Sequence, residues 1–326
     1  MCKKVTYFTK KLLNMQLETF WLQCKKLFMG IDMPFILKKI SIPQECNKKI
    51  QQFLIDDAKL NISNSQKLLA KGRVFDENHK VLQNGQKVKG EFIQVALFEG
   101  HTRGLKPIFE TEDFAVFDKP SGIMVHPTSR NTEYTLLDEI RYHFGESANL
   151  AHRIDQETSG LVLITKHKYS DIILKEMFEN KQYDKNYLAV VEGKVEDAIT
   201  INSGIKKATN SKIGVKMETS EDGKDSLTFI RPLKYFKDTN QTLVEAVPQT
   251  GRQHQIRVHL ESIGHRIVGD PIYGIDEDIA DLYLLKKLQN DVRVETTGNK
   301  RLLLHANYLS FQYKNINYKI YSKLSL

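Results

Sequence analysis

The segment Ala-His-Arg-Ile-Asp-Gln-Glu-Thr-Ser-Gly at residues 151–160 runs directly into the apolar run Leu161–Ile164. Its closing Thr-Ser-Gly predicts a tight turn that leads into a buried strand. Asp155 stands just before this turn, and Arg153 precedes it by two residues. A carboxylate at the rigid entrance of a strand is well suited to act as a fixed nucleophile or base. The same carboxylate could instead accept backbone hydrogen bonds of the turn, so the residues alone leave both roles open.

A second segment, Thr-Gly-Arg-Gln-His-Gln-Ile-Arg-Val-His-Leu at residues 250–260, has apolar residues at helical spacing and predicts a helix. Arg257 in this helix could form a charge-assisted pair with a carboxylate and so hold that acid ionised and oriented. Alternatively, Arg257 could lie at the surface or cap the end of a helix. His254 and His259 are five residues apart rather than four, and no third ligand is near them in the sequence. We therefore expect no metal site here.

A third segment, residues 185–193, alternates as a strand and carries Tyr187, for which a half-buried aromatic is the plainest interpretation. The remaining pattern alternates strands and helices. Strands are predicted at Phe114–Phe117, Ile123–Val125, Leu161–Ile164, Tyr187–Val191 and Leu243–Val247, and helices at Thr135–His143, Ser170–Asn180 and His254–Ile263. Residues 275–300 predict a polar, partly helical excursion, in which the acidic residues 276–278 should form a solvated loop.

The composition is that of an ordinary soluble globular protein. Of the 326 residues, 40% are hydrophobic and 27% are charged. No apolar run approaches the roughly 20 residues that cross a bilayer, so no membrane association is expected. The three cysteines all lie in the first 46 residues and form no disulfide framework, which fits a reducing, cytoplasmic location. No glycine-rich nucleotide-binding pattern is present, so neither a nicotinamide cofactor nor ATP is expected.

The excess of basic over acidic residues lies entirely in the N-terminal part of the chain. Lysine and arginine number 48 against 40 acidic residues, a net charge of +8. Residues 1–100 hold 17 basic and 9 acidic side chains, whereas the remaining 226 residues hold 31 of each. This distribution favours a polyanionic partner that is gripped by the N-terminal part. A solvated lysine-rich surface is the alternative.

The chain is predicted to have three parts. Residues 1–34 form a basic extension of unknown value, in which Met33 is a plausible alternative start. Residues 35–100 form a small unit, with helices predicted at Lys48–Leu60 and Ser65–Lys71 and strands at Arg73–Phe75 and Phe92–Phe98. Residues 101–326 form the larger domain. Two short helices followed by a small hairpin are a compact RNA-binding arrangement.

The small unit resembles an S4 domain, the RNA-binding module of a ribosomal protein. Ser63, Ser65, Gly72 and Val74 fit that pattern, while Asn64 stands where an arginine is usual. A capping domain without a role in RNA binding is the alternative. The residues that we expect to contact RNA in this unit are Lys48, Lys49, Ser63, Lys67, Lys71 and Arg73.

The larger domain closely resembles the RluA/RluD-type family of RNA pseudouridine synthases. The family's His-Arg-Leu-Asp-x-x-Thr-Ser-Gly signature is met at residues 152–160, with Ile154 for the leucine. The Gly-Arg-x-His-Gln-Ile-Arg-x-His block is met at 251–259, and its continuation at 264–274, with Arg266 where the family has proline. A Leu-His-Ala element follows at 304–306. Four blocks in the same order make the resemblance specific.

The resemblance implies an α+β fold, a mixed and mainly antiparallel central sheet flanked by helices, preceded by a small S4-like α/β module. It implies conversion of specific uridines to pseudouridine in structured RNA, most often large-subunit ribosomal RNA. The reaction breaks the bond from ribose C1′ to N1 of the base and forms a bond to C5, so it is redox-neutral. It implies no cofactor and no metal, and a monomer is the default.

The resemblance also implies the roles of four residues. Asp155 is the catalytic carboxylate; it could attack C1′, attack the uracil ring, or remove a ribose proton, and the sequence does not choose among these. Tyr187 would stack on the base or handle a proton, and Arg257 would pair with the carboxylate. Because a stacked uracil is out of reach, the nucleotide should be flipped out, with Arg153 filling the vacated stack.

Three other functions are consistent with parts of the sequence. The enzyme could act on transfer RNA. A non-catalytic RNA-binding or ribosome-assembly factor on the same fold would keep the basic N-terminal part but would not need Asp155. A nucleoside hydrolase would need a metal or a cluster of water-activating acids, and the acidic residues 276–278 are a poor candidate for one.

Overall fold

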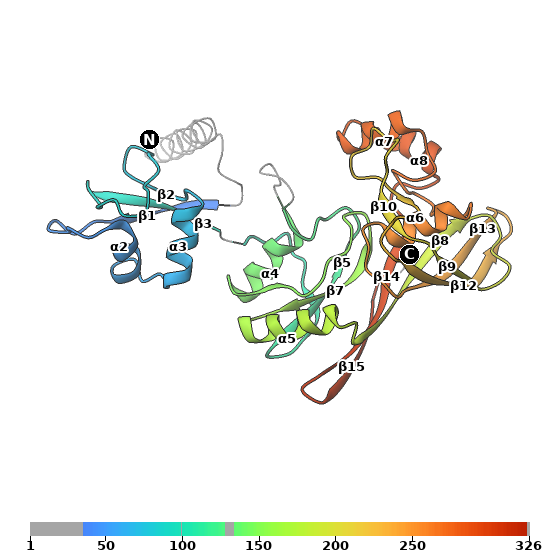
Figure 1. Ribbon diagram of the computed structural model, residues 1–326, viewed down its shortest axis with the longest axis horizontal. Helices are drawn as coiled ribbons and strands as arrows, with labels where there is room; N and C mark the ends of the chain where they lie inside the picture. The colour runs from blue at the N-terminus through green and yellow to red at the C-terminus, as the bar shows by residue number, and fades with distance from the viewer. Residues whose placement is uncertain (1–34, 99, 128–133, 325–326) are drawn as a thin grey trace, which may run out of the picture. The chain divides into compact units, whose positions relative to one another are not determined.

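The computed structural model describes residues 35–98, 100–127 and 134–324. Within them the chain divides into two compact units, one formed essentially by residues 35–98 and the other by residues 100–126 and 134–324 (Figure 1). The basic extension expected at residues 1–34, with Met33 as an alternative start, lies outside the described residues. No helix in the described ranges is long and apolar enough to cross a membrane.

The first unit packs two helices against a three-stranded antiparallel sheet. The sheet has the order β1-β3-β2, with β1 at Phe35–Ser41, β2 at Val74–Phe75 and β3 at Phe92–Phe98. The helices are α2 at Ile50–Asp56 and α3 at Ile62–Ala70. Their buried apolar residues form one core with those of the sheet: Ile50, Phe53, Leu54, Leu69, Val74, Val88, Ile93 and Val95.

Three expectations for this unit need correction. The first helix is shorter than the predicted Lys48–Leu60. The second begins three residues before the predicted Ser65, because Asn61 caps it by accepting a hydrogen bond from the Asn64 N–H at 2.8 Å. Strand β1 was not expected, since its partner β3 lies more than fifty residues further along the chain.

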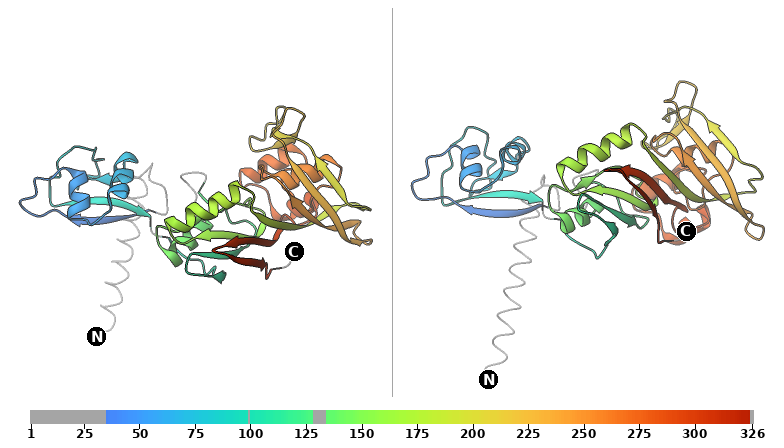
Figure 2. Two further views of the ribbon diagram at one scale, coloured as in Figure 1. Left: turned by 60° about the horizontal axis from the view of Figure 1, so that its bottom comes forward. Right: turned by 90° about the horizontal axis from the view of Figure 1, so that it is seen from below.

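The second unit is built on a mixed sheet of ten strands, which confirms the predicted fold class. The strands are β4 at Pro107–Glu110, β5 at Phe114–Lys119, β6 at Asn149–Leu150, β7 at Ser159–Thr165, β8 at Tyr183–Glu192, β9 at Ile199–Asn202, β12 at Leu227–Phe236, β13 at Gln241–Pro248, β14 at Leu304–Tyr313 and β15 at Ile316–Tyr321. Their order is β4-β5-β7-β14-β8-β13-β12-β9, with β6 beside β7 and β15 beside β14. Among these described strands β7 and β14 form the one parallel pair. Figure 2 shows β14 and β15 as a long hairpin, in dark red.

The described part of the second unit has five helices: α4 at Leu136–Phe144, α5 at Lys168–Glu179, α6 at Gln255–Ser262, α7 at Glu277–Leu284 and α8 at Asn290–Thr297. Alternate side chains of β5 and β7 belong to two separate apolar clusters, one with α5 and one with α4. Because successive side chains of a strand point to opposite faces, α4 and α5 cover opposite faces of this part of the sheet (Figure 1). Helix α6 packs on β8 and β13.

The apolar triplet Ile123–Val125 is not a strand, contrary to the prediction. Its carbonyl groups are satisfied elsewhere: the Leu136 N–H at the start of α4 donates to Met124 at 2.8 Å, and the Lys119 ammonium donates to Ile123 at 2.8 Å. The triplet is therefore an irregular connection, and it supplies a hydrogen-bond acceptor for the N-terminal end of α4.

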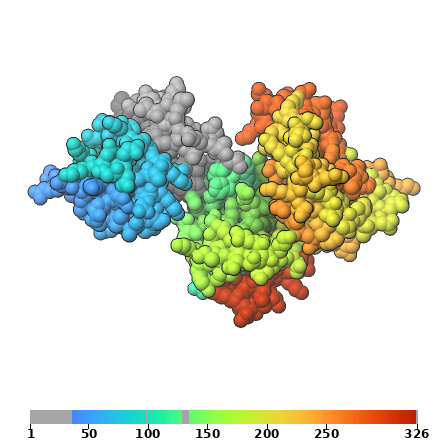
Figure 3. Space-filling view, in the orientation of Figure 1, coloured from blue at the N-terminus to red at the C-terminus, as the bar shows by residue number. Residues whose placement is uncertain are grey.

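The acidic residues 276–278 do not form a loop, contrary to the prediction, although Asp276 and Asp278 are exposed to solvent. Asp276 caps α7 by accepting a hydrogen bond from the Asp278 N–H at 2.7 Å. Glu277 pairs with Lys216 at 2.9 Å, and Asp278 pairs with Lys212. These contacts fasten α7 to the connection between β10, at Ile205–Lys207, and β11, at Met217–Thr219. Figure 3 shows the orange atoms of α7 and α8 beside the yellow atoms of this segment.

Strand β14 brings segments that are far apart in the sequence into one place, because it lies between β7 and β8. Ser159 Oγ and His305 Nδ1 are hydrogen-bonded at 2.9 Å. Gly160 has φ of +108°, and a Cβ there would overlap the backbone of Ala306. Only glycine therefore permits this approach of the signature to β14. On its other side Ala306 lies opposite Tyr187 of β8.

Candidate active site

A pocket of about 100 Å³ lies where the segment before β7, the strand β8 and the start of α6 meet. All four residues to which the resemblance gave a role at the reaction centre line this pocket. Its lining is Arg153, Ile154, Asp155, Thr158, Lys185, Tyr187, Pro248, Thr250, Gly251, Arg252, His254, Gln255, Ile256, Arg257 and Leu304. Four of these side chains are cationic and one is anionic, so the pocket is suited to a negatively charged ligand.

Arg257 joins two carboxylates. Its Nη1 donates to Asp155 Oδ2 at 3.3 Å, while its Nε and Nη2 donate to the two oxygens of Asp270 at 2.7 and 2.8 Å. Arg257 and Asp270 are almost fully buried, with 3% and 1% of their side chains exposed, whereas Asp155 is 30% exposed. The geometry therefore leaves Asp155 open to a ligand and buries the two groups that hold it in place.

Asp270 is a permanent anion at the base of the site. Burial alone would raise its pKa, but the Arg257 guanidinium and the backbone N–H groups of Ile272 and Tyr273 hold that pKa below its ordinary value. The Tyr273 ring also lies 4.9 Å from the Arg257 guanidinium carbon. The orientation of Arg257 is thus set by protein groups.

Tyr187 and Lys185 lie on one face of β8. Burial raises the pKa of Tyr187, and the nearby Asp155 charge raises it further, so the phenol stays protonated. Lys185 Nζ lies 5.9 Å from the Tyr187 ring and 5.2 Å from the Tyr183 ring. Within the described residues this ammonium has no hydrogen-bond or ion-pair partner, and desolvation lowers the pKa of Lys185 to about 8.

The two histidines of the α6 segment are engaged with protein groups. His254 Nδ1 is hydrogen-bonded to the Tyr273 hydroxyl at 2.9 Å, and its Nε2 lies 3.9 Å from Asp155 Oδ2. Burial lowers the pKa of His254 to about 4, so the ring is neutral near pH 7. His259 is hydrogen-bonded to Thr228 Oγ1 at 2.8 Å and to the Ser203 carbonyl at 3.0 Å.

The turn after β5 supports the segment that carries Asp155. The buried Lys119 ammonium donates to the carbonyl oxygens of Pro120, Ile123 and Gln156 at 3.0, 2.8 and 2.9 Å. Ser121 Oγ donates to the Glu157 carbonyl at 2.6 Å. The backbone on the C-terminal side of Asp155 is therefore tied to a second, independent turn.

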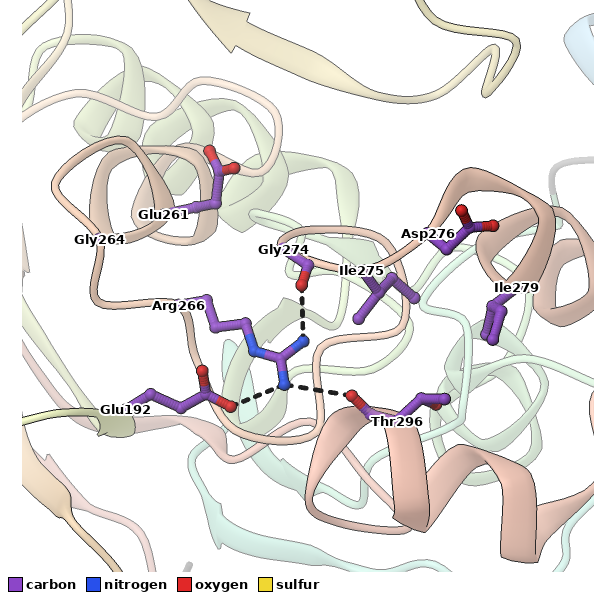
Figure 4. Close-up of a pocket in the computed structure, with 9 residues that line it drawn as sticks. All are labelled: Glu192, Glu261, Gly264, Arg266, Gly274, Ile275, Asp276, Ile279 and Thr296. Carbon is purple, nitrogen blue, oxygen red and sulfur yellow. Dashed lines mark hydrogen bonds and ion pairs between the residues drawn. The ribbon is translucent and has the colours of Figure 1, made fainter.

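A larger hollow of about 570 Å³ lies elsewhere in the second unit, and Figure 4 shows the residues that line it. Arg266, which stands where the family has proline, bridges its floor. The guanidinium donates to the Gly274 carbonyl at 2.7 Å and to the Thr296 carbonyl at 3.1 Å, and pairs with Glu192 at 2.7 Å. Glu261 and Asp276 also line this hollow, which makes it a poor site for RNA.

The residues expected to contact RNA in the first unit are spread over its two helices. Ser63 and Lys67 are exposed on one face of α3, and Lys71 is exposed at its C-terminal end. Lys49 is exposed at the start of α2, while Arg73 is partly buried. The neighbouring Lys48 pairs with Asp57 at 2.7 Å and with Asp56 at 3.4 Å, which offsets much of its charge.

Sequence reasoning missed three residues of the site. Asp270 was noted as part of a block but not as the partner of Arg257. Lys185 was assigned only to a strand, although it stands two residues before Tyr187 and so shares its face. Lys119 carries no signal in the sequence, because its burial depends on segments that are remote along the chain.

Residues 113–262 match the family described as RNA pseudouridylate synthase. A Helicobacter pylori J99 protein named "Uncharacterized RNA pseudouridine synthase" is 37% identical over 295 residues, which cover 90% of this chain and 97% of that protein. The chain belongs to the RNA pseudouridine synthases. Members of this family are isomerases, and the protein is therefore an enzyme that converts uridine to pseudouridine within RNA.

Two further synthases extend the comparison, one to the RluA/RluD-type branch of the family and one to its fold. The "Ribosomal large subunit pseudouridine synthase D" of Nitrosomonas europaea is 35% identical over 175 residues, 52% of this chain and 50% of that protein. The solved structure of "Human RNA Pseudouridylate Synthase Domain Containing 1" matches with a TM-score of 0.55 and 25% identity over 69% of this chain and 85% of that chain. The resemblance to this family is thus confirmed, while the S4-like nature of the first unit stays a prediction.

Proposed function

We propose that Asp155 is the catalytic carboxylate of this synthase and that its substrate is a uridine of large-subunit ribosomal RNA. The observation that supports the catalytic role is the pairing of Asp155 with Arg257 at the floor of a cationic pocket. Arg257 donates a hydrogen bond to the Asp155 carboxylate and orients it at the pocket. A carboxylate that is already anionic needs no base to activate it.

The proposed reaction uses few protein groups. A flipped uridine enters the pocket at a cost of a few kcal/mol, with its base against the Tyr187 ring and with Arg153 at the exposed rim. Asp155 acts on the nucleotide, the C1′–N1 bond breaks, and the base turns so that a C1′–C5 bond forms. C5 then loses its proton and N1 gains one, so the isomerisation releases nothing. Because the base must recombine rather than diffuse away, exclusion of water matters more than a second acid. Because its pKa is raised, the Tyr187 hydroxyl stays protonated near neutral pH, so it can donate a hydrogen bond to the base but cannot serve as a general base.

Lys185 extends this proposal to the RNA backbone. Its ammonium lines the pocket and has no anionic partner among the described residues. A desolvated cation in such a place gains most from a phosphate. We assign Lys185 to a phosphodiester next to the flipped nucleotide.

Two features support ribosomal RNA as the substrate. The Nitrosomonas relative is named for the large ribosomal subunit. The first unit is basic and has the helix-and-sheet arrangement expected of an RNA-binding module. The proposal keeps a cytoplasmic location and a monomeric chain.

The catalytic role is tested with Asp155→Asn, which removes one charge at nearly constant shape. The variant should form no pseudouridine in an RNA substrate, as detected by a label that reacts only with pseudouridine. Its melting temperature and its Kd for RNA should stay close to those of the unaltered enzyme, since Arg257 keeps its two bonds to Asp270. Appreciable turnover by the purified variant would refute the role.

The substrate is tested by deletion of the gene and mapping of pseudouridines in ribosomal and transfer RNA. A site that vanishes from large-subunit ribosomal RNA and returns with the intact gene, but not with the Asp155→Asn form, supports the proposal. A site that vanishes only from transfer RNA would replace ribosomal RNA as the substrate. No lost site in either RNA would contradict both.

A further inference from the structure

Glu157 lies two residues after Asp155 and is buried, with 10% of its side chain exposed. A buried carboxylate is costly unless its oxygens find partners. Both partners come from the excursion formed by α7 and α8. The Tyr283 hydroxyl of α7 donates to Glu157 Oε1 at 2.8 Å, and Arg293 Nη2 of α8 donates to Oε2 at 2.6 Å.

Arg293 also reaches the segment that carries Asp270. The same Nη2 donates to the Gly269 carbonyl at 3.3 Å, directly before Asp270 in the chain. The Arg293 guanidinium carbon lies 5.1 Å from the centre of the Tyr283 ring, which fixes its plane. The Arg293 guanidinium therefore connects the segment that carries Asp155 with the segment that carries Asp270. These are the two aspartates to which Arg257 donates hydrogen bonds.

Helix α8 is itself fixed to the same segment at its other end. The Gly269 N–H donates to the Thr297 carbonyl at 2.7 Å, and Arg266 joins the Thr296 and Gly274 carbonyls (Figure 4). Arg293 is thus carried by a helix that is anchored to the Asp270 segment independently of Glu157. Any shift of α8 would be passed to both sides of the Asp155–Arg257 pair.

We propose that Arg293 is a positioning residue of this synthase: through Glu157 it holds the segment that carries Asp155 at the distance from Asp270 that Arg257 must span. This inference rests on the proposed role of Asp155. It assigns a task to residues 275–300, which are otherwise remote from the chemistry. Catalytic groups need placement within a few tenths of an ångström, and a displacement of about 1 Å can lower a rate by about 100-fold.

A purely structural role for Arg293 would affect the folded fraction but not the chemistry of the folded enzyme. The test therefore compares single-turnover rate constants under conditions where circular dichroism shows each variant fully folded, with Kd for the same RNA measured separately. Arg293→Met should lower the rate constant between about 10-fold and 100-fold and leave Kd unchanged. Arg293→Lys, which can still reach Glu157 with a charged donor, should recover a large part of that loss.

A double variant tests whether the effect passes through Glu157. Glu157→Gln with Arg293→Met should be no slower than Arg293→Met alone, because both changes interrupt the same connection. Glu277→Gln is the matched control: it removes the ion pair of α7 with Lys216 but leaves Glu157 untouched. This control should keep the unaltered rate constant.

Three results would overturn the proposal: an unchanged rate constant for Arg293→Met, a loss in Kd rather than in rate, or an equal loss for Glu277→Gln. The result for Asp155→Asn separates this proposal from the proposed function. If Asp155→Asn keeps its turnover, the function of Asp155 is wrong whatever Arg293 does. If Asp155→Asn is inactive and Arg293→Met is fully active, only the positioning role is wrong.

Discussion

Arg257 is bound to Asp270 more tightly than to Asp155. Two hydrogen bonds of 2.7 and 2.8 Å join Arg257 to the buried Asp270, whereas one bond of 3.3 Å reaches the partly exposed Asp155. A bidentate arginine–carboxylate pair fixes the plane of the guanidinium as well as its position. The remaining donor, Nη1, is consequently aimed at Asp155 before any RNA arrives, which is the preorganisation that electrostatic catalysis requires.

Asp270→Asn is expected to destabilise the fold strongly. The change leaves the buried Arg257 without its main counter-charge, and loss of one member of a buried pair typically costs about 3–5 kcal/mol. Urea unfolding followed by circular dichroism measures this loss. The control is Arg231→Gln, which breaks the Arg231–Glu245 pair, in which the arginine side chain is 64% exposed. That control should cost no more than about 1 kcal/mol, and equal losses for both variants would contradict the prediction.

Lys185 should make RNA binding depend on pH. The ammonium is the form that binds a phosphate, and the pKa of Lys185 in the free protein is about 8. As the pH rises through that value the free protein loses the proton, so the affinity for RNA should fall. Lys185→Arg stays charged over this range and should bind RNA with little dependence on pH.

The dependence is measured as Kd by fluorescence anisotropy at pH values on either side of 8. Lys185→Met should bind weakly at each pH, while Lys194→Met, which alters an exposed lysine paired with Glu196, should behave like the unaltered enzyme. Persistence of the full pH dependence in Lys185→Arg would show that another group titrates.

Tyr187 should contribute its ring to binding and its hydroxyl to the chemistry. Tyr187→Phe keeps the ring between Ala306 and Ala246 and should leave Kd for RNA within about twofold. Loss of one hydrogen-bond donor to the reacting group typically lowers a rate by about 10²–10³-fold, and single-turnover measurements should show a fall in that range. Tyr187→Leu should also weaken binding. An unaltered rate for Tyr187→Phe would limit this residue to stacking.

The exposed lysines of α3 should account for part of the salt dependence of RNA binding. Lys67→Gln and Lys71→Gln are each expected to reduce the slope of log affinity against log salt by about one and to leave the turnover of bound RNA unchanged. The slopes are measured by titration at several salt concentrations. Lys194→Gln is the control, since its partner Glu196 offsets its charge. Unchanged slopes for Lys67→Gln and Lys71→Gln would remove α3 from the RNA interface.

Much of the second unit could be predicted because its local patterns are strong. The buried strand after the signature and helices α4, α5 and α6 were placed within a few residues, since periodicity and capping residues act over short distances. The prediction failed at Ile123–Val125 and at residues 276–278. In both places the decisive partners, Lys119 and helix α4 for the first and Lys212 and Lys216 for the second, depend on tertiary packing.

The order of residues along the chain was enough to indicate the family, the catalytic domain and the aspartate on which its chemistry is proposed to depend. Those conclusions rest on residue types at fixed spacing, and spacing is a property of the chain itself. Folding decided that Asp270 fixes the guanidinium of Arg257, that the pocket ammonium of Lys185 has no anionic partner among the described residues, and that α8 reaches Glu157. Strand β14 lies between β7 and β8 and so brings remote segments of the chain together. The burial and pairing of these side chains depend on this arrangement, because desolvation and hydrogen bonding depend on distances in space.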